Sequence, residues 1–501
     1  MADWPSAPPA AHGIIQLEGG RCGSEAGAWL LSEAALFFVS VPAMTDKPRS
    51  TDEFRAAAMP SFHRIDLPPS SNLMLRQLAV SETSGALLAV VGQDHDGGWQ
   101  LAWVDCPSPA ACKVTAREAF PHGAVKDLTV GGGSLFIATA AALYRADTTL
   151  RKLEPAPIMR GIMRSVEAEG ERLAVATELE MAYSEDGGKS FLPHMGRYPV
   201  VGTLLDGPAQ DMVYAGESLW IATKPAISVV TANAYTRIGA TDGLPYNNTQ
   251  TIRFGAGRVW MGSDKGVVVR DLASDSWQYL YGPRWHPGGA VRAIAAVPGP
   301  ATAAGSSSGV VVLGTDAGLS VIWVDDTFTL ERKAEWYAPV MKRHDRFGLL
   351  SDCTLTTPGD RGSCYKHDSD NDGLWTTLNV AGESFRYAVQ GTAEAKASAW
   401  RHFEGLLLLN NVTGIKGLMA RSVVPLNWSN GPRWPNHDPP SQKGGRPCNW
   451  VNSSTDPELA WKCDTSNDEV VGHYFAYLTV AELLAETAEA TRTNTPAASL
   501  R

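Results

Sequence analysis

A short run of apolar residues, closed by one small residue and often by Thr or Ser, recurs along the first two-thirds of the chain. Two copies are Leu135-Phe136-Ile137-Ala138-Thr139 and Val259-Trp260-Met261-Gly262-Ser263. The small residues of the six copies are Gly92, Ala138, Ala176, Ala222, Gly262 and Gly314, which follow one another at steps of 38 to 52 residues. A unit of this length cannot bury its apolar residues alone, so neighbouring copies must pack against one another.

Each copy is flanked by further short apolar runs at strand spacing. Around Gly262 these runs cover residues 250–254, 265–270 and 277–280. Four short strands repeated every 40–50 residues or so are typical of the blades of a β-propeller. We therefore expect an all-β propeller over residues 13–337, with the six small residues in equivalent inner strands. A seventh blade is expected from Gly13 to Ser40.

Two kinds of known propeller repeat resemble parts of this region. Residues 242–248 (DGLPYNN) followed by 259–266 (VWMGSDKG) resemble the two-component regulator propeller repeat, and residues 313–319 resemble its second half. Residues 184–191 (SEDGGKSF) resemble the Asp-box of sialidase-type propellers. This second resemblance implies a structural hairpin in which Asp186 binds loop amides and takes no part in catalysis.

After Tyr337 the apolar spacing changes from that of strands to that of helices. One predicted helix carries Leu374, Leu378, Ala381, Phe385 and Ala388 on one face and ends at Gly391. A second opens at Thr392 and turns Ala399, Phe403, Leu406 and Leu407 towards the core. A third covers residues 469–491, with Val471, Tyr474, Phe475, Leu478 and Leu483 as its apolar set. We expect a mainly α domain over residues 338–491 and a tail at 492–501.

Four motifs of this region resemble an uncharacterised group of proteins in which a propeller precedes an all-helical domain. The motifs cover residues 367–375, 383–389, 417–422 and 461–473, and the chain departs from the group at Cys463, where Gly is usual. The helical domain of that group resembles the six-hairpin (α/α) toroids of glycoside hydrolases and polysaccharide lyases. Such a toroid has about twelve helices of roughly 11–12 residues each, so we expect only an incomplete version here.

Acidic residues, His and Trp gather in two of these motifs. The candidate catalytic residues are His367, Asp368, Asp464, Asp468, Glu469 and His473, and the candidate substrate-binding residues are Trp375, Trp461, Arg386 and Arg421. Glycoside cleavage uses one carboxylic acid and one carboxylate, indole rings stack on sugars, and Arg binds a uronate carboxylate. We expect the two motifs to meet, with Asp368 or Asp372 facing Asp464 or Asp468, and with His473 and Arg386 adjacent.

Simpler structural roles remain open for the same residues. Asp368, Asp370 and Asp372 have the spacing of the first half of a Ca²⁺ loop, although Asn379 at its twelfth position cannot supply a bidentate carboxylate. Asp370 or Asp372 can instead cap the following helix. Ser466 to Glu469 has the pattern of a capping box, and acid clusters also form ion-pair networks.

The composition bears on partners. The 501 residues carry a net charge of -10 without a Lys/Arg-rich stripe, which argues against nucleic acid as a partner. The apolar run from Ala26 to Met44 is interrupted by Glu33, which disfavours a membrane span and suits two strands equally well.

Cysteine order favours an oxidising compartment. Cys106 with Cys112, Cys353 with Cys364, and Cys448 with Cys463 form three local pairs, and Cys22 is left over. Sequons at Asn247, Asn411, Asn427 and Asn452 point the same way. Free buried thiols in a cytosolic protein are the alternative, and no ordinary signal peptide is visible in residues 1–28.

Two functional hypotheses follow from different classes. The first is an extracellular carbohydrate-active protein, similar to glycoside hydrolases or polysaccharide lyases, or a truncated relic of one that binds a polysaccharide. The second is a non-catalytic propeller used for binding, with the helical segment as a packing module. A two-component sensor is a third idea, which the sequence supports less because no kinase or receiver pattern is present.

Overall fold

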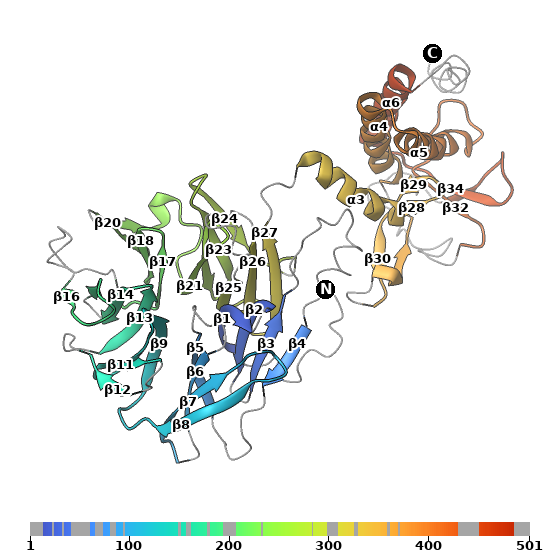
Figure 1. Cartoon of the computed structure of the whole chain (residues 1–501). Helices are drawn as coiled ribbons and strands as arrows, with labels where there is room; N and C mark the ends of the chain where they lie inside the picture. Colours follow the sequence, from blue (N-terminus) through green and yellow to red (C-terminus); the bar gives the residue numbers. More distant parts are fainter. Residues whose placement is uncertain are drawn as a thin grey trace, which may run out of the picture. The chain divides into compact units, whose positions relative to one another are not determined.

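The computed structural model in Figure 1 describes residues 14–22, 25–32, 35–41, 61–65, 74–80, 87–93, 96–148, 152–156, 162–177, 181–193, 207–231, 234–282, 284–297, 309–324, 329–357, 361–368, 371–428 and 450–484. Up to Thr329 these residues form one compact unit, and from Leu330 onward they form a second. The predicted boundary at residues 337/338 falls inside a helix of the second unit, α3 (Leu330–His344).

Seven small antiparallel sheets of consecutive strands follow one another in the first unit. The first sheet contains β1 (Ile14–Cys22), β2 (Glu25–Ser32), β3 (Leu36–Ser40) and β4 (Ser61–Ile65). The second contains β5 (Met74–Val80), β6 (Leu87–Gln93), β7 (Trp99–Asp105) and β8 (Lys113–Ala119). The third contains β9 (Val125–Gly131), β10 (Ser134–Thr139), β11 (Leu143–Asp147) and β12 (Leu153–Pro155). The predicted extra blade at residues 13–40 thus lies in the first sheet.

The next four sheets complete the unit. They are β13 (Met163–Glu169), β14 (Arg172–Thr177), β15 (Met181–Ser184) and β16 (Leu192–Pro193); β17 (Asp211–Ala215), β18 (Ser218–Ala222), β19 (Ile227–Val230) and β20 (Tyr235–Ile238); β21 (Thr249–Gly255), β22 (Arg258–Ser263), β23 (Gly266–Asp271) and β24 (Ser276–Leu280); and β25 (Val291–Val297), β26 (Gly309–Thr315) and β27 (Gly318–Val324). A short 3-10 helix, η1 (Ala240–Asp242), precedes β21.

The first strands of neighbouring sheets pack side by side, and β1 packs against β25. Apolar clusters fill the space between adjacent sheets; one combines Trp29 and Phe38 of the first sheet with Leu78 and Val104 of the second. Small antiparallel sheets arranged in this way are the blades of a β-propeller-like unit (Figure 1).

The predicted small residues all lie in the second strand of their sheets, next to the innermost strand. Ala138 pairs with Asp127 and Ala222 pairs with Asp211, and the copies at Ala176, Gly262 and Gly314 have the same register. The copy at Gly92 is shifted by one residue. A bulge in β5 places Val91 at the shared position, because Val91 is the residue that pairs after the bulge.

Side chains at this register join two of the inner strands to the innermost strand of the following sheet. The Asp127 carboxylate accepts hydrogen bonds from the Ser165 hydroxyl (2.8 Å) and the Val166 amide (2.9 Å) of the following sheet. Asp211 accepts equivalent bonds from Thr251 (2.8 Å) and the Ile252 amide (2.9 Å). The repeat thus carries an inter-blade contact as well as an apolar core.

Arg253 connects sheets that lie far apart in the sequence. Its guanidinium donates to Asp211 (2.6 Å) in the fifth sheet and to Glu18 (2.9 Å) in the first. Since each described sheet consists of consecutive strands, the ring has no strand shared between its ends. Side-chain packing therefore holds the first and last blades together: Leu17 and Val39 of the first sheet share an apolar cluster with Val312 of the last. Arg253, in the sixth sheet, adds an ion pair to the first.

Asp186 has the structural role that the Asp-box resemblance implies. Its carboxylate accepts bonds from the amides of Lys189 (3.0 Å) and Ser190 (2.9 Å) and from the Ser184 hydroxyl (2.7 Å). The hydrogen bonds from Ser190 are the largest cause of its pKa lying well below the usual value. The carboxylate is committed to its own turn between β15 and β16.

Two of the predicted disulfides are confirmed. Cys106–Cys112 and Cys353–Cys364 are bonded, with Cα atoms 4.0 and 5.5 Å apart. Cys463 is disulfide-bonded, whereas its predicted partner Cys448 lies outside the described residues. Cys22 is free, as expected. It is also buried, and burial raises the pKa of its thiol to about 12.

The second unit contains four helices in its described part. They are α3 (Leu330–His344), α4 (Asp372–Gln390), α5 (Ala393–Asn411) and α6 (Asn467–Leu483). Short elements accompany them: β28 (Asp345–Arg346) with β29 (Leu349–Leu350), β30 (Cys353–Leu355) with β31 (Cys364–Lys366) and η2 (Arg361–Ser363), and β34 (Leu459–Lys462) between β32 (Ser422–Pro425) and β33 (Trp450–Asn452). None of the helices among the described residues is long and apolar enough to span a membrane.

The predicted C-terminal end of α4 and the predicted start of α5 are confirmed, whereas α3 was not predicted. Gly391 has a left-handed conformation, and its amide donates to Tyr387 O (2.8 Å). The Thr392 hydroxyl accepts from the Ala395 amide and caps α5. α3 buries none of its residues and contains Pro339, although Leu330, Ala334, Tyr337 and Met341 have the spacing of one helix face, which the prediction overlooked.

The predicted inward faces of α4 and α6 are wrong. α4 buries small and polar residues, and α6 does the same around Gly472. The apolar residues expected in the core are exposed, namely Leu378, Phe385, Val471, Tyr474, Phe475 and Leu478. The helices approach each other closely through their small residues, so the large side chains lie on the outer face. Ala381 is the member of the α4 set that is buried as predicted, and the α5 set is buried at Ala399, Phe403 and Leu406.

Replacing Arg253 tests its contacts with the first and fifth sheets. Arg253→Met keeps the aliphatic stem and leaves the Glu18 and Asp211 carboxylates without their counter-ion. We expect the free energy of unfolding to fall by about 2–3 kcal/mol, less than for a fully buried pair because the three side chains keep some exposure. Chemical denaturation measures it. Lys152→Ala, which removes a solvent-exposed ion pair with Glu154, should leave stability unchanged. Equal stability of both variants would contradict a role of Arg253 in joining these sheets.

Asp127 should make the propeller less stable as the pH rises. Burial, together with the Asp211 charge, raises the pKa of Asp127 from its ordinary value to about 7. The folded state therefore binds this proton more tightly, and its contribution is complete below about pH 4 and lost through pH 7. Asp127→Asn keeps an acceptor for Ser165 and should flatten this loss. The free energy of unfolding of the wild type and of the variant is measured between pH 5 and 8. We expect the wild type to lose stability relative to the variant as the pH rises, and a difference that does not change with pH would refute this role of Asp127.

Candidate functional site

The first turns of α4 and α6 meet, as the two sequence motifs predict. Gly373 lies so close to α6 that an added Cβ would stand 2.8 Å from His473 Nε2 and 3.0 Å from Glu469 Oε2. From the α6 side of the same contact, a Cβ added to Gly472 would stand 2.6 Å from Thr377 Oγ1 in α4. Glycine at each contact allows the two helices to approach within side-chain distance of the acid and the imidazole.

Asp372 lies beside this contact in a buried ion pair. The Arg346 guanidinium and the Ser422 hydroxyl both donate to Asp372 Oδ2. Arg346 also donates to Ser351 Oγ (2.8 Å) and to Val423 O (2.6 Å). The carboxylate therefore holds three separate segments together, because α4, β28 and β32 all contribute to the same network.

Glu469 is a second buried acid, and unlike Asp372 it has no ion pair among the described residues. It is fully buried, and neither carboxylate oxygen has a hydrogen bond of normal geometry, although the nearby Leu374 amide and the Arg421 charge lower its pKa somewhat. Burial is the larger effect and, with the charges of Asp372 and Asp468, raises the pKa of Glu469 to about 8. The side chain thus carries a proton at neutral pH.

His473 is the neutral neighbour of this acid. It is fully buried one helical turn after Glu469, and burial lowers its pKa to about 4. Its Nδ1 lies 3.1 Å from the Tyr477 hydroxyl, while Nε2, the atom nearest Gly373, has no hydrogen-bond partner. An uncharged imidazole beside a protonated carboxyl is an arrangement that can hold or pass a proton.

The predicted capping box is not formed. Ser466 is the N-cap of α6 but makes no side-chain cap hydrogen bond, and the Glu469 side chain turns towards Gly373 instead. Asp464 and Asp468 are exposed, the former with 80% of its side chain accessible. The predicted pairing of these two acids with the other motif is therefore replaced by the buried acids Asp372 and Glu469.

The other predicted residues divide between the site and its surroundings. Arg421 is brought close, since it donates to Asp464 O (2.7 Å) and its charge acts on Glu469. Arg386 is not, because it lies thirteen residues along α4 from Gly373, about 20 Å at the helical rise, where it pairs with Glu383 (3.4 Å). Trp375 is partly exposed on the first turn of α4.

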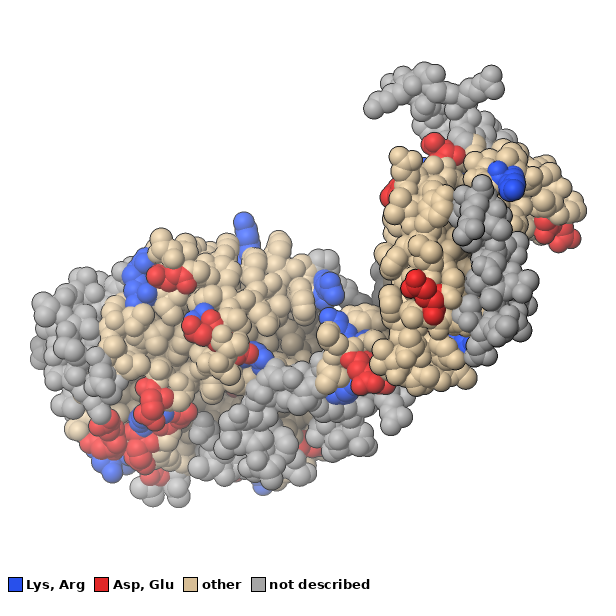
Figure 2. All heavy atoms as spheres, turned by 90° about the horizontal axis from the view of Figure 1, so that it is seen from above, with Lys and Arg blue, Asp and Glu red and all other residues tan. Residues whose placement is uncertain are grey.

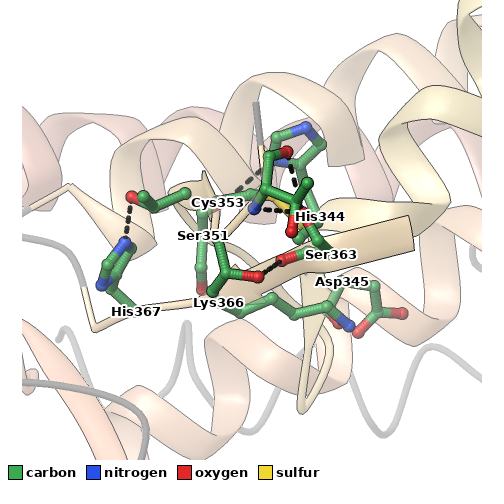
Figure 3. The surroundings of a disulfide bond; sticks show 11 residues. His344, Asp345, Ser351, Cys353, Ser363, Lys366 and His367 are labelled. Carbon is green, nitrogen blue, oxygen red and sulfur yellow. Dashed lines mark hydrogen bonds between the residues drawn. A yellow bond between two sulfur atoms is a disulfide. The ribbon is translucent and has the colours of Figure 1, made fainter. Parts of the chain in front are cut away.

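Trp461 and the first motif have mainly structural surroundings. Trp461 is buried in a cluster with Leu409 and Val423, a core position from which its ring cannot stack on a sugar. The His367 imidazole hydrogen-bonds to Thr354 and contacts the Tyr365 ring, both in the β30–β31 hairpin around the Cys353–Cys364 disulfide (Figure 3).

The proposed Ca²⁺ ligands are separated by their environments. Asp368 follows β31 and is half-buried, Asp370 lies outside the described residues, and Asp372 is bound by Arg346. The Arg346 guanidinium thus already neutralises Asp372, the third of the proposed ligands. The described residues therefore do not support a Ca²⁺ site at this loop. Arg346 itself had no sequence signal, because the short β28–β29 hairpin that positions it matches none of the motifs.

Comparisons with known proteins give propeller-like structures. No family profile matches the sequence, and no curated protein is detectably similar. The extracellular domain of the putative one component system BT4673 from B. thetaiotaomicron superposes with a TM-score of 0.43 and 14% identity, over 62% of this chain and 38% of that one. U3-55K superposes with a TM-score of 0.41 and 12% identity, over 63% of this chain and 97% of that one. The assignment of blades rests on the sheets themselves.

Gly373 provides a test of the contact between the helices. Gly373→Ala places a methyl group against His473 and Glu469, and we expect it to lower the free energy of unfolding by about 1–3 kcal/mol. Gly382→Ala is the matched control on the same helix, because nothing lies within 4 Å of its added Cβ. That variant should stabilise the chain by up to about 1 kcal/mol. Thermal unfolding of both variants measures these changes in stability. A change of the same sign in both variants would contradict the close approach of α4 and α6.

Proposed function

We propose that the chain is an extracellular carbohydrate-active protein, similar in chemistry to glycoside hydrolases or polysaccharide lyases, in which Glu469 is the proton donor. One observation carries the proposal: a fully buried carboxyl group whose pKa burial raises to about 8, so that it holds its proton at neutral pH. A general acid for glycosidic oxygen has this property.

Asp372 supplies the second carboxyl group of the proposed site. It is ion-paired with Arg346, while Glu469 is protonated, and two acids held in different environments can take different roles. Arg421 and the partly exposed Trp375 are the side chains proposed to bind the sugar. Because Glu469 is fully buried, the first turns of α4 and α6 must separate when the substrate enters.

Exposure of the four sequons and the disulfides support the extracellular part of the proposal. Asn247, Asn411, Asn427 and Asn452 are all exposed, as glycan attachment requires. Two described disulfides stabilise short loops, and such bonds persist in oxidising compartments. On the face shown in Figure 2, Lys and Arg side chains lie singly or beside acidic residues, without a stripe suited to nucleic acid.

A non-catalytic binding protein is the second candidate. The observation that favours it is the complete burial of Asp372, Glu469 and His473, which matches a structural polar cluster. In that case the helical unit is a packing module, and binding belongs to the propeller unit.

Turnover by a Glu469 variant separates the two candidates. The chain is incubated with neutral and acidic polysaccharides, and new reducing ends and unsaturated products are measured. We expect turnover that declines above about pH 8, as Glu469 loses its proton, and a loss of at least about 100-fold in Glu469→Gln. Glu482→Gln, an exposed position on the same helix, should act as wild type. Absence of turnover in the folded chain, or full activity of Glu469→Gln, would favour the binding protein.

A further inference from the structure

A row of aromatic side chains lies on the surface of the propeller unit, whereas Glu469 and its neighbours belong to the helical unit. Tyr246 precedes β21, Tyr279 is in β24, and Tyr281 directly follows β24. The rings of Tyr246 and Tyr279 are 6.1 Å apart and 9° from parallel, and those of Tyr279 and Tyr281 are 6.1 Å apart and 4° from parallel. Trp285 follows in the next loop.

These side chains are accessible although they are large and apolar. Exposed fractions are 39% for Tyr279, 52% for Tyr281 and 42% for Trp285. Single exposed apolar residues are ordinary, but three of them on one outer strand and the loop that follows it cost solvation free energy and need a reason.

The rings are held in place by their polar ends and by the backbone beneath. The Tyr246 hydroxyl donates to Asp264 (2.9 Å), and the Tyr279 hydroxyl donates to Lys265 O. Gly266 lies beneath Tyr281, where an added Cβ would stand 3.2 Å from its ring and 2.4 Å from Leu280 O. Rings fixed in this way lose little conformational freedom when a ligand binds.

We propose that Tyr246, Tyr279, Tyr281 and Trp285 form a binding surface for a neutral polysaccharide chain. The flat C–H faces of successive pyranose rings match a row of near-parallel aromatic rings, which combine an apolar body with a polar tip. Asp264, Lys265 and Arg284 border the row and offer partners for sugar hydroxyls. The surface does not depend on Glu469 and would serve either candidate function.

Two other ligand classes fit the observations less well. Single-stranded nucleic acid also stacks on aromatic rings, but it requires a positively charged groove, and the chain has a net charge of -10. A proline-rich peptide docks into grooves between aromatic rings that stand apart, whereas the three Tyr rings form one near-parallel row. Both are outcomes that the experiment distinguishes.

Affinity electrophoresis of the full chain tests the proposal. The protein is produced in a host that does not glycosylate Asn247, next to Tyr246, and run through gels containing a soluble β-glucan, xylan or polygalacturonate. We expect a neutral polysaccharide to retard the chain, and Tyr281→Ala and Trp285→Ala each to weaken this binding at least tenfold. Tyr281→Phe should bind as wild type, because stacking does not need the hydroxyl.

Matched controls keep the result specific. Tyr337→Ala removes an equally exposed tyrosine from α3 and should bind as wild type, with circular dichroism confirming that all variants fold. Glu469→Gln should also bind as wild type, so loss of turnover and loss of binding are independent results. The proposal is overturned if no neutral polysaccharide retards the chain, if the alanine variants bind normally, or if only an oligonucleotide or a proline-rich peptide binds through Tyr281.

Discussion

The contact between neighbouring innermost strands is the constraint on which the first unit depends. Each described sheet is made of consecutive strands, so no hydrogen-bonded ladder joins one blade to the next. The carboxylates of Asp127 and Asp211 bridge this gap by accepting an amide and a hydroxyl from the following strand. Arg253 neutralises part of the negative charge of these inner strands through its ion pairs with Glu18 and Asp211. The apolar clusters between sheets supply most of the burial, but the polar contacts fix which strand faces which.

The helical unit solves a different packing problem. α4 and α6 meet through glycine, alanine, serine and threonine, which brings the backbones together and encloses Asp372, Glu469 and His473. Enclosure changes their chemistry: a fully buried carboxyl keeps its proton, and a fully buried imidazole stays neutral. The same close packing that makes Glu469 an acid at neutral pH also hides it, and this tension is the reason both functional candidates remain.

Local signals in the sequence were sufficient for the repeat, the short disulfides and the ends of two helices. The Asp186 turn and the caps at Gly391 and Thr392 depend on neighbouring residues only, and all three are formed as predicted. The shift at Gly92 arises from a bulge in the partner strand, which its own sequence does not show. The orientation of α4 was predicted wrongly because large apolar side chains usually turn inward, whereas here the small residues do. Arg346 and its partner Asp372 are far apart in the sequence, so only the fold reveals the pair.

The packing of α4 on α6 also affects how this chain can change in evolution. In most helices the conspicuous apolar stripe is the part that resists substitution, and small residues drift freely. Here the relation is inverted, because Gly373 and Gly472 have no room for even a methyl group, whereas Leu378 and Val471 face outward. Homologous chains should therefore vary in the apolar stripe and keep the glycines. A survey that ranks positions by hydrophobicity alone would overlook the residues that define this pair of helices.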